Sequence, residues 1–157
     1  MLEGDNPAGG GGRAVVFDIE TGEATPLSSH GSDITAVAMD DAGSIAMTGN
    51  TDGEIRVGPI TGEEPHLLLG HSGAVVKVAV DPLGRWIASN GYLGDLTVRL
   101  WPMPDLSRPP LHTLPREELI AKLKTLTNLR VVRDEESPTG WNLEVGPFPG
   151  WETAPEW

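Results

Sequence analysis

Three residues in the middle of the chain, His71, Ser89 and Asp95, are of the types that form a hydrolytic triad. In a triad the histidine takes the proton of a serine hydroxyl that attacks an acyl carbon, and the aspartate orients the histidine. This chemistry requires an exposed serine oxygen beside an oxyanion site. Ser89 instead lies within a run typical of a strand, and no Gly-x-Ser-x-Gly turn surrounds it. The residues therefore favour a structural role over acyl transfer.

The same residue types recur one repeat earlier in the chain. His30 precedes His71 by 41 residues, Thr48 precedes Ser89 by the same interval, and an aspartate, Asp52, follows Thr48 as Asp95 follows Ser89. A period of this size indicates a repeat architecture. Since a catalytic site would need the set only once, its recurrence indicates a structural function in each unit.

Short apolar runs must position these side chains. The runs are about five to seven residues long and rich in Val, Ile, Thr and Ala, which predicts strands rather than helices. Acidic turns that end in Gly43 and Gly84 separate the first two runs of each unit. Each unit is therefore expected to be a small antiparallel sheet, with its runs at residues 34–39, 44–48 and 54–58 in the first unit and 74–80, 85–89 and 97–101 in the second.

The second unit resembles the repeat of the WD-repeat β-propellers, whose blades carry Gly-His early and Trp-Asp at the end of the third strand. It has Gly70-His71, then Ile-Ala-Ser at 87–89 and Asp-Leu-Thr-Val-Arg-Leu-Trp at 95–101. Residues 14–18 are similar to the end of another third strand, with Phe17 in the place of the tryptophan.

This resemblance covers residues 13–114 and implies an all-β fold. The implied structure is a partial β-propeller of four-stranded antiparallel blades, two blades plus a half-blade, with a small α+β C-terminal extension. The half-blade is expected at 13–30, and the two blades at 31–70 and 71–114. Residues 1–12 are expected to be a glycine-rich disordered start or linker.

The resemblance also implies a role for the repeated polar residues. In WD-repeat propellers a histidine, an aspartate, a serine or threonine and a tryptophan of one blade form a buried hydrogen-bonded network. Gly58-Pro59 stands where Trp-Asp is expected, so the first network is short of a tryptophan. The implied structural networks are His71, Ser89, Asp95 and Trp101 in one blade and His30, Thr48 and Asp52 in the other.

Two blades and a half do not make a closed propeller. Propellers have about four to eight blades, and stacked repeats need at least three units for a continuous core. The favoured interpretation is that the chain is the C-terminal portion of a longer propeller with further blades upstream. The alternative is self-association, in which three copies close a ring of seven or eight blades.

Residues 115–157 have a different pattern, expected to form one helix, a hairpin and a Pro/Trp-rich tail. Leu119, Ile120 and Leu123 follow helical spacing. Residues 129–132 and 141–145 alternate as paired strands, whereas 111–114 resemble one last blade strand. The tail holds Trp151 and Trp157, which either cover a blade or dock a partner. The extension resembles those of some bacterial WD-repeat proteins.

Composition excludes several classes of function. A net charge of -12 and a pI near 4.6 disfavour binding to nucleic acid or to anionic membranes. The chain has no cysteine, and no acidic pair has the spacing of a calcium loop, so no cofactor and no metal are expected. No apolar stretch reaches about 18 residues, and a soluble, cytoplasmic protein is expected.

What remains is surface, and the function expected is that of a non-catalytic scaffold for protein partners rather than an enzyme. In the family, partners commonly bind loops at one end of the blades. The alternative function is a C-terminal sensor or docking part of a larger signalling enzyme, a kinase or protease whose catalytic domain lies upstream. The candidate partner contacts are Asn50, Thr51, Asn90, Tyr92, Leu93, Trp151 and Trp157.

Overall fold

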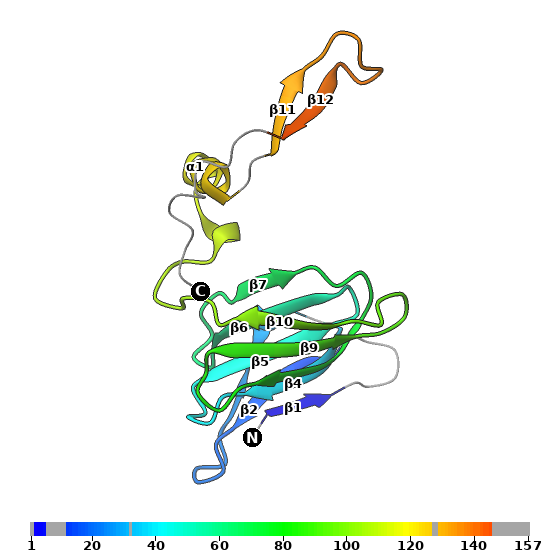
Figure 1. Ribbon diagram of the computed structural model, residues 1–157. Helices are drawn as coiled ribbons and strands as arrows, with labels where there is room; N and C mark the ends of the chain where they lie inside the picture. The colour runs from blue at the N-terminus through cyan, green and yellow to red at the C-terminus, as the bar shows by residue number, and fades with distance from the viewer. Residues whose placement is uncertain (1, 6–11, 32, 127–128, 146–157) are drawn as a thin grey trace. The chain divides into compact units, whose positions relative to one another are not determined.

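A computed structural model describes residues 2–5, 12–31, 33–126 and 129–145 of the chain (Figure 1). The chain divides into two compact units, Met1–Pro110 and Leu111–Trp157. The described part of the first unit contains three antiparallel sheets, and that of the second contains a helix and a hairpin. No helix among the described residues is long and apolar enough to cross a membrane.

The first sheet contains β1 (Leu2–Asp5), β2 (Arg13–Phe17) and β3 (Ala24–Pro26) in that spatial order. Leu2–Asp5 were expected within a disordered start, and that expectation is wrong for these four residues. They pair with β2 from Leu2↔Val16 to Asp5↔Arg13, because the free edge of β2 offers backbone groups that need partners. Residues 6–11 lie outside the described part of the chain. The half-blade therefore contains one more strand than expected.

The second sheet is a four-stranded meander, as the repeat predicts for this unit. It consists of β4 (Ile34–Met39), β5 (Ile45–Asn50), β6 (Glu54–Pro59) and β7 (His66–Leu69), in sequence order. Asp40 closes the turn between its first two strands, because one carboxylate oxygen accepts from the backbone N–H groups of Ser44 and Ile45 at 2.7 and 2.8 Å.

The third sheet has three strands, β8 (Val75–Val80), β9 (Trp86–Gly91) and β10 (Val98–Pro102), with β9 in the centre. A fourth strand expected at 111–114 is not formed, and that expectation is wrong. Leu111–Thr113 form a short 3-10 helix, η2, directly after Pro109-Pro110. Two prolines cannot donate to a strand ladder, so this segment does not extend the sheet. The first unit accordingly ends at Pro110.

The second sheet packs between the other two, and its two faces contact different partners. On one face, Met47, Ile55 and Val57 form a core cluster with branched residues of β8 and β9. On the other face, Ala46 packs in a cluster with Ala14, and Leu27 and Ile34 belong to the same cluster. The sheets thus follow one another along the chain as repeated layers.

The second unit contains α1 (Arg116–Leu126) and the strands β11 (Leu129–Arg133) and β12 (Trp141–Val145). The two strands pair antiparallel from Leu129↔Val145 to Arg133↔Trp141. The helix and the hairpin lie where the sequence predicts them. The Pro/Trp-rich tail lies outside the described residues.

Candidate functional site

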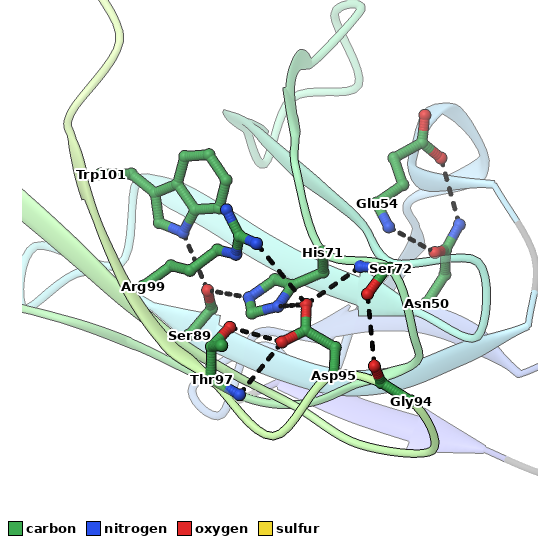
Figure 2. A network of polar contacts seen from close by, with 10 residues as sticks. All are labelled: Asn50, Glu54, His71, Ser72, Ser89, Gly94, Asp95, Thr97, Arg99 and Trp101. Atoms are coloured by element: carbon green, nitrogen blue, oxygen red, sulfur yellow. Dashed lines mark hydrogen bonds and ion pairs between the residues drawn. The ribbon is translucent and has the colours of Figure 1, made fainter.

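The repeated polar residues of the second sequence repeat, residues 71–101, meet in a buried cluster (Figure 2). His71 Nδ1 lies 2.7 Å from Asp95 Oδ2, and His71 Nε2 lies 2.7 Å from Ser89 Oγ. Trp101 extends the chain of contacts, because its indole Nε1 donates to Ser89 Oγ at 2.8 Å. His71, Ser89 and Asp95 are each less than a tenth exposed. The four residues come from four elements, so the contacts tie the loop before β8, strand β9, the turn after β9 and strand β10 together.

Each polar atom of this cluster has a consistent hydrogen-bonding role. The Asp95 carboxylate can only accept, so His71 Nδ1–H donates to it, and in the neutral ring with this tautomer Nε2 accepts from the Ser89 hydroxyl. Ser89 Oγ donates to the histidine and accepts from Trp101. Buried polar networks stabilise one packing when every member is satisfied. The arrangement therefore fits a structural network.

Asp95 organises the turn between β9 and β10. Its Oδ2 accepts from the Ser72 backbone N–H at 2.9 Å, and its Oδ1 accepts from the Thr97 N–H at 3.0 Å and from the Thr97 hydroxyl. Arg99 Nη2 lies 3.8 Å from the same carboxylate. The Thr97 hydroxyl and the Ser72 N–H hold the pKa of Asp95 well below its ordinary value, although desolvation acts in the opposite direction. The carboxylate is thus a buried anion with several donors.

The cluster has triad-like distances but lacks the surroundings that acyl transfer needs. Ser89 is 3% exposed and sits in the middle of β9, paired with Val78 on one side and Arg99 on the other. Its oxygen is already in contact with two side chains. A nucleophilic serine must instead reach substrate beside oxyanion donors. The geometry supports the structural interpretation.

In the preceding sequence repeat, which forms the second sheet, the structure brings together only part of the expected set of polar residues. His30 Nδ1 lies 3.1 Å from Thr48 Oγ1, and both side chains are buried. Asp52 is exposed at the tip of the β5–β6 turn, and among the described residues no hydrogen bond or ion pair joins its carboxylate to His30. Asn50 holds this turn instead, because its Oδ1 accepts from the backbone N–H groups of Asp52 and Glu54 at 3.0 and 2.9 Å.

Asp95 reaches the histidine of its repeat and Asp52 does not, because the loops that carry them differ in length. Four residue steps separate Thr48 from Asp52, and six separate Ser89 from Asp95. The longer loop folds back so that Asp95 reaches His71, whereas the short turn leaves Asp52 in solvent. The assignment of Asp52 to a buried network is therefore wrong.

His30 lies in a more apolar place than its counterpart. Its Nε2 is buried and has no hydrogen-bond partner among the described residues. Gly58 occupies the strand position that Trp101 has one repeat later, and a Cβ on Gly58 would lie 3.0 Å from the Cα of Pro65. Burial, followed by the nearby Arg56 charge, lowers the pKa of His30 to about 4, while Glu64 raises it. At neutral pH the His30 ring is therefore uncharged.

Glycines let the loops at one end of the sheets lie against one another. A Cβ at Gly53 would lie 2.6 Å from the carbonyl oxygen of His71, and a Cβ at Gly73 would overlap the carbonyl oxygen of Tyr92. The turn after β5, the loop before β8 and the turn after β9 are therefore in direct backbone contact. They form one continuous surface, here called the loop surface, made of residues 50–54, 71–74 and 91–97.

The candidate partner residues divide into three groups. Tyr92, Leu93 and Thr51 are exposed on the loop surface, with Tyr92 52% and Leu93 74% accessible. Asn50 is half-buried, and its side-chain oxygen already accepts hydrogen bonds within its own turn. Asn90 is half-buried within β9. Trp151 and Trp157 lie outside the described residues. In the part of the chain that the structure describes, no group of three or more His, Cys, Asp or Glu residues could hold a metal ion.

Sequence reasoning missed several residues that build the site. Thr97 and Ser72 hold Asp95, and Arg56 reaches from β6 to the backbone oxygen of Ser29 at 2.9 Å. Leu96 was also missed, although it is 83% exposed on the same turn as Tyr92. The Asp-x-Thr spacing of Asp95 and Thr97 is a signal that could have identified the first pair, since such side chains cap their own turns.

We expect Gly73→Ala to lower the free energy of unfolding of the first unit by about 1–3 kcal/mol, the usual cost of overpacking a tight site. The added methyl group meets a backbone carbonyl, which cannot rotate away as a side chain can. Urea denaturation followed by tryptophan fluorescence measures the change. Ser72→Ala is the matched control and should stay within about 0.5 kcal/mol of wild type. Equal stability of the two variants would contradict the backbone contact at Gly73.

Comparison with known proteins agrees with the repeated sheets. Residues 23–57 and 62–102 each match the family described as WD domain, G-beta repeat. The first stretch contains His30 and Thr48, and the second contains His71, Ser89, Asp95 and Trp101. Neither match extends past Pro102. No curated protein matches the chain.

Proposed function

From the two matched stretches, which support a WD-repeat family for this chain, we propose that the protein is a non-catalytic scaffold that presents its loop surface to a protein partner. WD40 repeats generally mediate contacts between proteins, and their domains are typically non-catalytic. The observation that carries the proposal is the exposed apolar group Tyr92, Leu93 and Leu96 on a turn that buried contacts hold in place.

The turn is preorganised for binding. Asp95, at its centre, is anchored by His71, Ser72 and Thr97, so the exposed residues on either side have a fixed backbone. Leu93 adopts φ 51°, a left-handed conformation that costs a leucine about 1 kcal/mol or more. A rigid surface loses less conformational entropy on binding, and aromatic anchors commonly dominate interface energies.

The chemistry of the partner follows from the same surface. Tyr92 offers an aromatic ring with a polar hydroxyl, and the neighbouring leucines offer apolar contact area, which suits a protein surface. The net charge of -12 works against phosphate backbones and anionic lipids. A protein partner therefore fits this surface better than nucleic acid or membrane.

The test compares affinity capture by the wild-type chain with capture by Tyr92→Ala, read by quantitative mass spectrometry. We expect partners bound through the loop surface to be depleted at least tenfold, equivalent to about 1.4 kcal/mol, because Tyr92 is the only described aromatic residue on that surface. Leu83→Ala, on the exposed turn between β8 and β9, is the matched control and should capture the same partners as wild type. Equal capture by all three proteins would overturn the proposed function.

A further inference from the structure

The loop surface carries acidic side chains and neither lysine nor arginine. Its acidic residues are Asp52, Glu54 and Asp95. Glu54 already has a cationic partner, because Arg56 Nη2 lies 3.0 Å from its Oε2. Asp95 likewise has Arg99 Nη2 at 3.8 Å from its Oδ2. Asp52 is exposed, and among the described residues no hydrogen bond or ion pair involves its carboxylate. Its negative charge is therefore available to a partner.

A second exposed carboxylate borders the loop surface at the same place. The backbone oxygen of Asp33 accepts from the Thr51 N–H at 3.2 Å, which holds the segment before β4 against the β5–β6 turn. The Asp33 side chain is exposed and forms no hydrogen bond or ion pair with any described residue. Arg13, on the neighbouring first sheet, lines a pocket with Pro26 and Ser28 and forms no ion pair with Asp33. The side of the loop surface at the second sheet is thus acidic.

The side of the loop surface at the third sheet is apolar. Tyr92, Leu93 and Leu96 are exposed there, on the turn after β9. The loop before β8 contacts the backbone of both neighbouring turns and so lies between the two sides. In this loop Ser72 is small and exposed, and Gly73 has no side chain because a Cβ there would overlap the Tyr92 carbonyl oxygen. No bulky side chain of this loop therefore separates the acidic side from the apolar side.

The packing of the sheets sets the distance between the two sides. The β5–β6 turn belongs to the second sheet, and the turn after β9 belongs to the third. Packed sheets lie about 10 Å apart. An extended chain advances about 3.3–3.6 Å per residue, so a segment that crosses from one side to the other places its two contacts about three residues apart.

We propose that the loop surface binds an extended protein segment that carries a lysine or arginine about two to four residues from an apolar side chain. The inference rests on the proposed function and specifies the chemistry of its partner. The basic side chain lies against Asp33 and Asp52, and the apolar side chain lies against Tyr92 and the neighbouring leucines.

Charge complementarity selects this partner over the alternatives. Opposite charges across an interface favour encounter and fix the register of a bound segment, whereas like charges disfavour the wrong partner. The net charge of -12 attracts basic segments over a longer range in the same way. A segment that is apolar alone would use only the side with Tyr92, and an acidic segment would be repelled by Asp33 and Asp52.

The first test selects binders to the full chain from a library of random peptides displayed on phage. We expect the enriched peptides to carry a lysine or arginine about three residues from an aliphatic or aromatic residue. In a synthetic copy, replacing that basic residue by glutamine should weaken binding about two- to fivefold, the size of an exposed ion pair, as measured by fluorescence anisotropy. Salt at about 1 M should remove the difference. Enrichment without a preference for basic residues, or no enrichment, would overturn the proposal.

The second test reverses the charge of the acidic side in the double variant Asp33→Lys, Asp52→Lys. Both side chains are exposed, so the variant should keep the wild-type near-ultraviolet circular dichroism. We expect it to bind the selected peptide about fivefold more weakly or less, and to regain affinity for a copy with glutamate in place of the basic residue. Asp41→Lys, on the exposed turn between β4 and β5 at the other end of the sheet, is the matched control and should bind like wild type.

Tyr92→Ala separates this inference from the proposed function. Suppose that Tyr92→Ala loses captured partners, but the doubly reversed variant binds the selected peptide as well as wild type does. The inference is then overturned, and the proposed function stands. If Tyr92→Ala captures the same partners as wild type, the proposed function fails, and the inference fails with it.

Discussion

Replacing His71 by alanine should lower the free energy of unfolding of the first unit by about 3–5 kcal/mol, the combined cost of a buried cavity and of the hydrogen bonds that Asp95 and Ser89 lose. Asp95, which is 3% exposed in the folded chain, loses its contact with the ring at 2.7 Å. Ser89 loses its acceptor at the same time, and a cavity remains where the imidazole was. Urea denaturation monitored by tryptophan fluorescence measures the change, with Trp101 as a reporter inside the network.

The matched control for His71→Ala is Asp52→Ala. Asp52 has the residue type expected for the other network but lies exposed on its turn, so its replacement should change stability by less than about 0.5 kcal/mol. A structural network also predicts that neither variant alters ester hydrolysis, which should be absent in the wild type. A small loss in His71→Ala with an equal loss in Asp52→Ala would contradict the geometry of both units.

The strand pattern of the repeats could be predicted from sequence because a side-chain period of two is local information. The runs expected at 34–39 and 44–48 correspond to β4 (Ile34–Met39) and β5 (Ile45–Asn50), and the acidic turn between them closes as expected. The contact between His71 and Ser89 could also be predicted from the sequence, since both positions recur at the repeat period. Local pattern and repeat spacing gave the same answer here, which makes such predictions reliable.

The errors occurred where a non-local constraint decides. Asp52 has the right residue type, but the length of its turn sets the direction of its carboxylate. Leu2–Asp5 carry no strand pattern of their own and pair because β2 offers an edge. Residues 111–114 have strand-forming side chains, yet Pro109-Pro110 before them cannot join a ladder. Side-chain type therefore failed to predict structure where backbone hydrogen bonding was the stronger constraint.

The exposure of the apolar residues of β10 was missed for a related reason. Val98 and Leu100 belong to an apolar run that sequence alone assigns to a core, and nothing local states which side of the sheet is covered. Only the comparison of equivalent residues in adjacent sheets separates the buried set from the exposed one. Burial is a property of the stack of sheets, whereas the repeat pattern describes one sheet at a time.

Acidification should destabilise the first unit through His30 before the carboxylates titrate. The pKa of His30 is about 4 in the folded chain against an ordinary value of 6.5. Between these pH values the unfolded chain binds a proton that the folded chain does not, so stability falls as the pH decreases from 6.5 toward 4. The full loss is about 3 kcal/mol, from about 1.4 kcal/mol per unit of pKa difference. Chemical denaturation at a series of pH values, with imidazole titration by NMR, measures both quantities.

Two variants show whether this pH dependence arises at His30. His30→Gln has no titrating ring, so the decrease attributed to His30 between pH 6.5 and 4 should disappear. Arg56→Gln removes the second cause of the lowered pKa and should raise the pKa of His30 in the NMR titration, which makes the decrease smaller. Asp95 does not interfere with this measurement. Because its pKa is lowered in the folded chain, its contribution to stability is lost only as the pH falls below the ordinary carboxylate pKa of 3.8. An unchanged slope in His30→Gln would show that another group carries the acid sensitivity, and that the buried Nε2 is protonated without penalty.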